Sequence, residues 1–197
     1  MSRVFLFCIA EEAKPFIPRL LALDKISYPF ILVQSREFPA EADWFKETLA
    51  DGEPFESDFI GASAADCTAW ALEHQVQHNQ IDQDKVAIVD ARSAEDETIE
   101  LRFYVRDVVA NLLRPGQQSN AWYDFRVPYQ KAPRLLTDLP YGDADETYGV
   151  YFWRRDGLVD ERGVFDVEKA EELILQGEGF VPLDEEAWDG LHGKNEE

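Results

Sequence analysis

The chain has 197 residues and carries 40 acidic against 19 basic side chains, a formal net charge of −21. This excess predicts repulsion from nucleic-acid phosphates and from anionic membrane surfaces, so we expect partners of neither kind. Hydrophobic residues make up 45% and aromatic residues 13% of the chain, which is enough to fill a sizeable core.

The first fifty residues predict two strands, each followed by a helix. Arg3–Ile9 and Phe30–Val33 are short apolar runs typical of strands. Glu11–Leu23 has helical spacing but contains Pro18, so a bend is expected there. Pro39 is expected to open a second helix that runs to Ala50, with Gly52 just beyond its end.

A third helix is expected from Ser63 to about Asn79. Ser63 followed three residues later by Asp66 resembles a capping box. This helix also carries the one spacing suited to a metal ion, because Cys67, His74 and His78 fall on one stripe. Core packing of the cysteine, with both histidines at the wet end of the helix, explains the same pattern, so no metal site is favoured and no cofactor is expected.

The central stretch, Lys85–Arg106, predicts an antiparallel hairpin on which the rest of the fold is built. Val86–Val89 is apolar on both faces, and Thr98–Val105 alternates apolar with polar residues around the charged Arg92–Glu97. Asp90 ends the first of these strands, a position where α/β sheets place chemistry, and Arg92 is expected to hold it ionised. A turn-forming Asp beside a surface Arg is the plainer interpretation.

The remaining elements alternate in type. We expect a helix at Val105–Leu113, an extended run at Trp122–Tyr129 and an irregular stretch at Lys131–Asp145. A strand at Tyr148–Trp153 and a helix at Val167–Gln176, capped by Asp166, should follow. An edge strand at Phe180–Leu183 and a final helical turn to Leu191 are expected last. Together these elements predict an α+β fold with a mixed, mostly antiparallel sheet and helices packed on it. Residues 1–192 are expected to form a single domain and 193–197 a disordered tail.

Aromatic and arginine residues gather in two places and are the best candidates for a binding surface. They are Trp122, Tyr123, Arg126 and Tyr129 in one group, and Trp153, Arg154 and Arg155 in the other. In an extended strand, Trp122, Asp124 and Arg126 share one face while Tyr123 and Phe125 share the other. Burial of most of these rings in the core is the alternative.

The catalytic motifs of the commonest enzyme classes are absent from the sequence. It contains no glycine-rich phosphate loop, GxSxG elbow, kinase motif set or CxxC zinc pair. Two cysteines, Cys8 and Cys67, do not make a disulfide framework, and the apolar start of the chain resembles a strand more than a signal peptide. The sequence therefore favours a cytoplasmic protein that is not an enzyme, although catalysis stays open.

Three parts of the chain resemble an uncharacterised bacterial and fungal domain family of unknown function. They are the segment FILVQSREFPAEADWFKETL, the strand pair VAIVDARSAEDETIELRFYV and the later DERGVFD. The resemblance spans the middle two-thirds of the chain, and Trp122–Leu139 departs from it. It implies a small α+β domain with no established activity and no catalytic residue.

The negative charge is concentrated toward the end of the chain. Asp156–Glu197 holds fourteen acids and three bases, a net of −11, whereas the preceding residues carry a net of −10. We therefore expect an interaction protein that docks on a basic protein partner, as an immunity or inhibitor protein docks on a toxin. Plain solubility, imitation of nucleic acid, a metal site, and a small-molecule or enzyme pocket near Asp90, Arg92 and Arg126 are the alternatives. The sequence does not indicate the oligomeric state.

Overall fold

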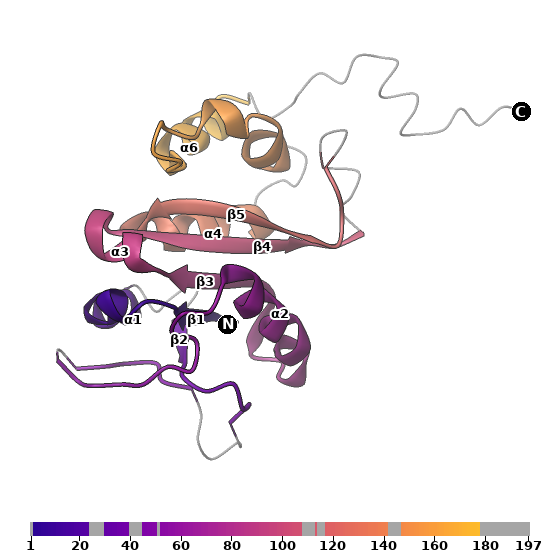
Figure 1. Ribbon diagram of the computed structural model, residues 1–197. Helices are drawn as coiled ribbons and strands as arrows, with labels where there is room; N and C mark the ends of the chain where they lie inside the picture. The colour runs from indigo at the N-terminus through magenta and orange to yellow at the C-terminus, as the bar shows by residue number, and fades with distance from the viewer. Residues whose placement is uncertain are drawn as a thin grey trace, which may run out of the picture.

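A five-stranded mixed sheet in the order β2-β1-β3-β4-β5 lies at the centre of the protein (Figure 1). The computed structural model describes residues 2–23, 30–39, 45–50, 52–107, 113, 117–141 and 147–177, with 138–141 described by their backbone alone. The strands are β1 (Arg3–Cys8), β2 (Phe30–Val33), β3 (Ile81–Val89), β4 (Thr98–Val105) and β5 (Ala121–Pro128). The predicted α+β class, with helices packed on a mixed sheet, is confirmed.

The sheet is half parallel and half antiparallel, rather than mostly antiparallel. β1 pairs in parallel with both β2 and β3, and β4 pairs antiparallel with both β3 and β5. The two parallel pairs arise because each of the first two strands is followed by a long connection that returns to the same end of the sheet.

Both faces of β1 are covered, which explains its unbroken apolar sequence. Val4, Leu6 and Cys8 belong to a first core on one face, and Phe5 and Phe7 belong to a second core on the other. All five side chains are fully buried. A strand buried on both faces reads as a continuous apolar run, as expected for the parallel part of a sheet.

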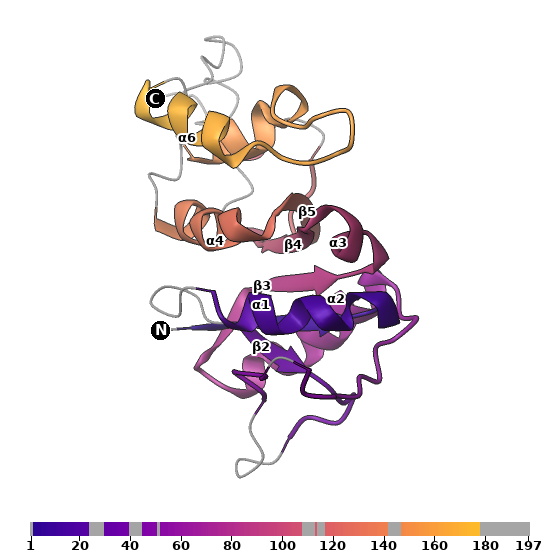
Figure 2. The same cartoon turned by 90° about the vertical axis from the view of Figure 1, so that its left-hand side faces the viewer.

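Helices cover the two faces of the parallel part (Figure 2). The 3-10 helix η1 (Glu11–Phe16) and the short α1 (Ile17–Leu21) pack in the first core, and α2 (Ala64–His74) packs in the second. The predicted capping box of α2 is present, since Ser63 accepts a hydrogen bond from the Asp66 backbone and Asp66 accepts one from the Ser63 backbone. The α-helix ends at His74 and continues as the 3-10 turn η2 (Gln75–Gln77), so it is shorter than predicted.

The predicted hairpin of β3 and β4 is confirmed, with a short helix in place of a simple turn. α3 (Ala91–Asp96) joins the two strands, with Asp90 as its N-cap. Glu97 ends the helix with a φ of 57°, in the left-handed region that side chains other than Gly seldom adopt.

The segment after β5 differs most from prediction. Lys131–Asp145, predicted to be irregular, begins at the last residue of η4 (Tyr129–Lys131) and contains α4 (Ala132–Tyr141). Pro133 lies in the first turn of α4, where a missing N–H costs nothing. Tyr148–Trp153, predicted to be a strand, forms the π-helix η5 (Gly149–Trp153). Beside β5, the Arg126 carbonyl accepts a hydrogen bond from the Phe165 N–H, not from this segment.

The last described elements are η6 (Arg155–Gly157) and α6 (Val167–Leu175). The prediction for α6 is confirmed, because Asp166 accepts a hydrogen bond from the Lys169 backbone and Gly177 follows the helix with a φ of 69°. The predicted edge strand Phe180–Leu183, the helical turn to Leu191 and the tail lie outside the described residues.

Two earlier predicted helices have different outcomes. Residues 45–50 of the predicted Pro39–Ala50 helix are not helical, since Lys46 forms an isolated bridge with Leu32 on the outer edge of β2. Most of the predicted Val105–Leu113 helix lies outside the described residues, and Val105 itself is the last residue of β4. Within the described ranges, no helix has the length and apolar character needed to cross a bilayer.

Candidate functional site

Strands β4 and β5 carry a row of charged and aromatic residues on one side, which we call the polar face. It consists of Glu100, Arg102 and Tyr104 on β4 and Trp122, Asp124 and Arg126 on β5. In Figure 1, α4 lies behind these two strands and no labelled helix lies in front of them. Ile99, Leu101, Phe125 and Val127, which alternate with the polar residues, are buried in the first core.

Each cross-strand pair on the polar face joins unlike partners. Glu100 lies opposite Arg126, Arg102 opposite Asp124, and Tyr104 opposite Trp122. The rings of the last pair have centroids 5.3 Å apart. Opposite charges directly across an antiparallel pair stabilise its register, so this pattern favours the observed alignment of β4 with β5.

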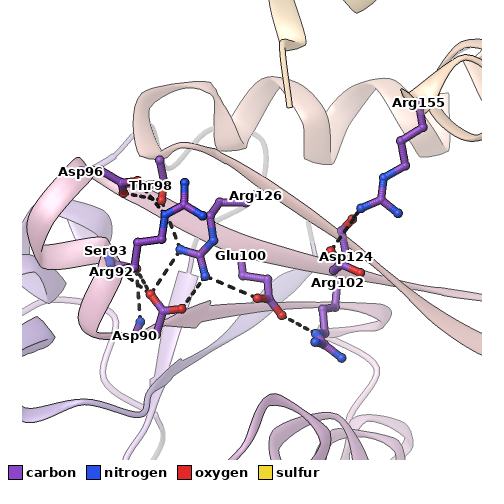
Figure 3. Close-up of polar contacts among 10 residues, drawn as sticks. All are labelled: Asp90, Arg92, Ser93, Asp96, Thr98, Glu100, Arg102, Asp124, Arg126 and Arg155. Atoms are coloured by element: carbon purple, nitrogen blue, oxygen red, sulfur yellow. Dashed lines mark hydrogen bonds and ion pairs between the residues drawn. The ribbon is translucent and has the colours of Figure 1, made fainter. Parts of the chain in front are cut away.

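Arg126 is the centre of a hydrogen-bonded network at the end of β3 (Figure 3). Its Nη1 donates to Asp90 Oδ1 at 3.2 Å and to Thr98 Oγ1 at 3.1 Å. Its Nη2 donates to Asp90 Oδ2 and, at 3.4 Å, to Glu100 Oε2. Arg126 is only 8% exposed, so its charge is held almost entirely by these acceptors.

Asp90 has two structural roles at once. As the N-cap of α3 it accepts hydrogen bonds from the Ser93 backbone and hydroxyl, both at 3.0 Å, and it also pairs with Arg126. Partial burial alone would raise the pKa of the Asp90 carboxyl, but the hydrogen bonds and charge of Arg126, together with those from Ser93, lower the pKa below its ordinary value. Asp90 is therefore a fixed negative charge at neutral pH.

Arg92 lies in the same network but does not contact Asp90, contrary to the prediction that it holds Asp90 ionised. Its Nε donates to Asp96 at 2.8 Å, and Asp96 in turn accepts the Thr98 hydroxyl at 2.6 Å. Thr98 then links this branch to Arg126. Asp90, Arg92 and Arg126 thus belong to one network, but Arg126 rather than Arg92 pairs with Asp90.

The network is suited to holding strands together more than to proton transfer. A general acid or base needs a pKa near the working pH, whereas the pKa of Asp90 is lowered and both of its oxygens accept hydrogen bonds within the chain. An incoming anion would have to displace Asp90 from Arg126. The network therefore links β3, β4 and β5 through side-chain hydrogen bonds and ion pairs.

The aromatic and arginine candidates do not form one surface. Trp122 and Arg126 lie on the polar face, and Trp122 also packs against the second core. Tyr123, Tyr129 and Trp153 pack against the first core. Arg155 reaches β5 from η6, donating to the Asp124 carbonyl at 2.6 Å and carboxylate at 3.1 Å and lying over the Phe125 ring. Arg154 precedes it at the end of η5. The predicted division of β5 into two faces is confirmed.

The metal candidates have other partners. Cys67 is fully buried in the second core, and burial raises the pKa of its thiol to about 12. His74 Nδ1 lies 2.7 Å from the Trp70 carbonyl, and its ring stacks on Trp70. His78 lies beyond the end of α2 and accepts a hydrogen bond from the Gln80 backbone. No group of three metal-ligating side chains occurs in the part of the chain that the structure describes.

Four residues that bond directly to Asp90, Arg92 or Arg126 were not among the predicted site residues: Ser93, Asp96, Thr98 and Glu100. The alternation of Thr98, Glu100 and Arg102 along β4 was visible in the sequence, but its register against β5 was not. A shift of one residue would have placed the same side chains in the core.

Comparisons with protein-family models, with curated proteins and with solved structures find no match. They give no support to the resemblance to a family of unknown function.

Proposed function

We propose that this chain is an acidic protein-interaction domain that docks on a basic protein partner. The observation that carries the proposal is the pairing of its cations. Within the described residues, most Arg and Lys side chains form an ion pair with a carboxylate of the same chain. They are Arg3, Lys14, Arg19, Lys46, Lys85, Arg92, Arg102, Arg106, Arg126, Lys131, Arg134, Arg155 and Arg162.

This pairing leaves the surplus charge on carboxylates. With 40 acids against 19 bases, the chain has 21 more carboxylates than cations. Unpaired charges of one sign at a surface steer a partner of the opposite sign and raise its rate of association. A cationic protein is therefore the partner class that this surface suits best.

The acidic C-terminal region begins with carboxylates that build structure. Asp160 and Asp166 hold loops and a helix cap, and Glu168 and Glu171 pair with Lys131 and Arg134 of the η4–α4 segment. The seven acids and one base of residues 178–197 carry a further net charge of −6. We assign the docking role to this last stretch, and we place the protein in the cytoplasm, where its two free thiols suit the reducing conditions.

Affinity capture from a lysate of the source cells tests this proposal. We expect the full chain to retain a basic protein at low salt and to release it at high salt, because salt screens exposed charges. The variant Asp184→Asn/Glu185→Gln/Glu186→Gln should lose the partner. The control variant Glu12→Gln/Glu37→Gln/Glu73→Gln, which removes the same charge elsewhere, should keep it. Capture that resists high salt, or equal loss in both variants, would contradict docking through the C-terminal charge.

A further inference from the structure

We propose that the polar face binds the polar face of a second copy of this chain. The face differs from the rest of the protein in its charge balance. Glu100 and Asp124 contribute two negative charges, and Arg102 and Arg126 contribute two positive ones. Each of the four also has an ion pair within its own chain. Two copies of a chain with a net charge of −21 repel each other. The repulsion is weakest where the charges of the contacting face cancel, as they do on the polar face.

The register of β4 and β5 makes the face complementary to itself. A two-fold axis that runs along the strands, between β4 and β5, places β5 of one copy over β4 of the other. Arg102 of each copy then lies over Asp124 of its mate. In the same way Tyr104 lies over Trp122, and Glu100 over Arg126. Because every cross-strand pair joins unlike residues, this one operation matches opposite charges and two aromatic rings in successive rows.

Each edge strand of the sheet makes a backbone hydrogen bond to a segment outside the sheet. On β2, the Leu32 N–H donates to the Lys46 carbonyl at 2.8 Å, and on β5 the Arg126 carbonyl accepts from Phe165 at 2.7 Å. Strand addition needs such backbone groups to be free. The side chains of the polar face differ in exposure: that of Asp124 is exposed, whereas Trp122 is partly buried against the second core.

The pair of Arg102 and Asp124 is the most accessible charged pair of the face, and the experiments below change these two residues. The Asp124 side chain is 55% exposed and the Arg102 side chain 23% exposed, whereas that of Arg126 is 9% exposed. Two sheets that pack face to face lie about 10 Å apart, a distance that long Arg and carboxylate side chains can span. The contact involves two strands only, so we expect a weak dimer that forms at high concentration.

Sedimentation analysis over a range of protein concentrations at physiological ionic strength tests the proposal. The unchanged chain should form dimers. Arg102→Glu sets a carboxylate against Asp124 of the mate and should raise the dimer dissociation constant about tenfold or more. Arg162→Glu makes the same change in charge at a 67%-exposed side chain away from this face and should leave the constant unchanged.

A mixing experiment separates a docking effect from a folding defect. Arg102→Glu alone and Asp124→Arg alone should each be monomeric. When they are mixed in equal amounts they should form a mixed dimer, because two negative charges then meet two positive ones. The double variant R102E/D124R should dimerise by itself, and circular dichroism checks that each variant is folded. An unchanged chain that stays monomeric at the highest concentration reached, equal weakening by Arg162→Glu, or a mixture that stays monomeric would each overturn the proposal.

Discussion

Asp90 and Arg126 join the end of β3 to β5 across the intervening β4. The two strands are not neighbours in the sheet, so their pairing adds a link that the backbone ladder does not provide. Asp90 also begins α3, and the same carboxylate therefore fixes a helix start, a strand end and an outer strand. The pair is largely removed from water, with side-chain exposures of 27% for Asp90 and 9% for Arg126.

Removing Arg126 should destabilise the fold strongly. In Arg126→Met, Asp90 and Glu100 would lose their shared cation while remaining partly buried. Breaking a buried pair in this way costs about 3–5 kcal/mol, since an uncompensated charge is left behind. Urea unfolding measures the loss of free energy, and Arg162→Met, at an exposed pair, should change it by about 0.5 kcal/mol or less. A small loss for both variants would show that water reaches Asp90 when Arg126 is gone.

The same pair should make stability fall at acid pH. The pKa of Asp90 is lower in the folded chain than its ordinary value of about 3.9. Its contribution is therefore complete above that ordinary value and disappears as the pH falls through the lower, folded pKa. Asp90→Asn should be less stable than the unchanged chain at neutral pH and should approach it in the acid range, as measured by urea unfolding at a series of pH values.

Asp84 provides a matched control on the same strand. Burial, opposed by the charge and hydrogen bond of Arg106, raises the pKa of Asp84. The sign is then reversed, because a carboxyl whose folded pKa is raised contributes stability below its ordinary pKa and loses that contribution as the pH rises through the folded value. Asp84→Asn should not reproduce the neutral-pH loss of Asp90→Asn. Identical pH profiles for the two variants would contradict the role given to Arg126.

Both cysteines should be unreactive in the folded protein. Cys8 and Cys67 are fully buried, and burial raises the pKa of their thiols to about 11 and about 12. A thiol reagent attacks the thiolate, which is scarce under these conditions. We expect dithionitrobenzoate to label neither residue at neutral pH and to label both after unfolding in guanidinium. Fast labelling of the native chain would show that one of the two cores opens.

The elements that sequence patterns predicted well are those whose local signals agree with the fold. The capping residues Ser63 and Asp66, the capping Asp166 and the alternation along β5 each specify one conformation without help from distant residues. Asp90 was identified from its place at the end of a strand. Its partner Arg126 was found only as a member of an aromatic group, because the contact between them depends on the alignment of three strands.

The segments that sequence patterns predicted wrongly are those in which tertiary packing decides. Val150, Tyr151 and Phe152 resemble a strand, but all three are buried together as a π-helix against Phe125 and Phe165. Pro133 and Pro140 suggested an irregular chain, but both lie within α4, at its second and its penultimate residue.

We expect the described chain to unfold in one step, because the first core joins its C-terminal segments to the sheet. Phe165, at 1% exposure, contacts the rings of Phe125 and Tyr151 at centroid distances of 5.2 and 5.3 Å, and so joins the C-terminal segments to the sheet. Phe165→Ala should cost about 3–5 kcal/mol, whereas Leu175→Ala, at a 78%-exposed side chain, should cost little. Circular dichroism and tryptophan fluorescence, followed in the same urea titration, should give one shared midpoint that moves with Phe165→Ala. Two separate midpoints would instead divide the chain into a sheet that unfolds late and a C-terminal part that unfolds early, and the predicted single domain would then be wrong.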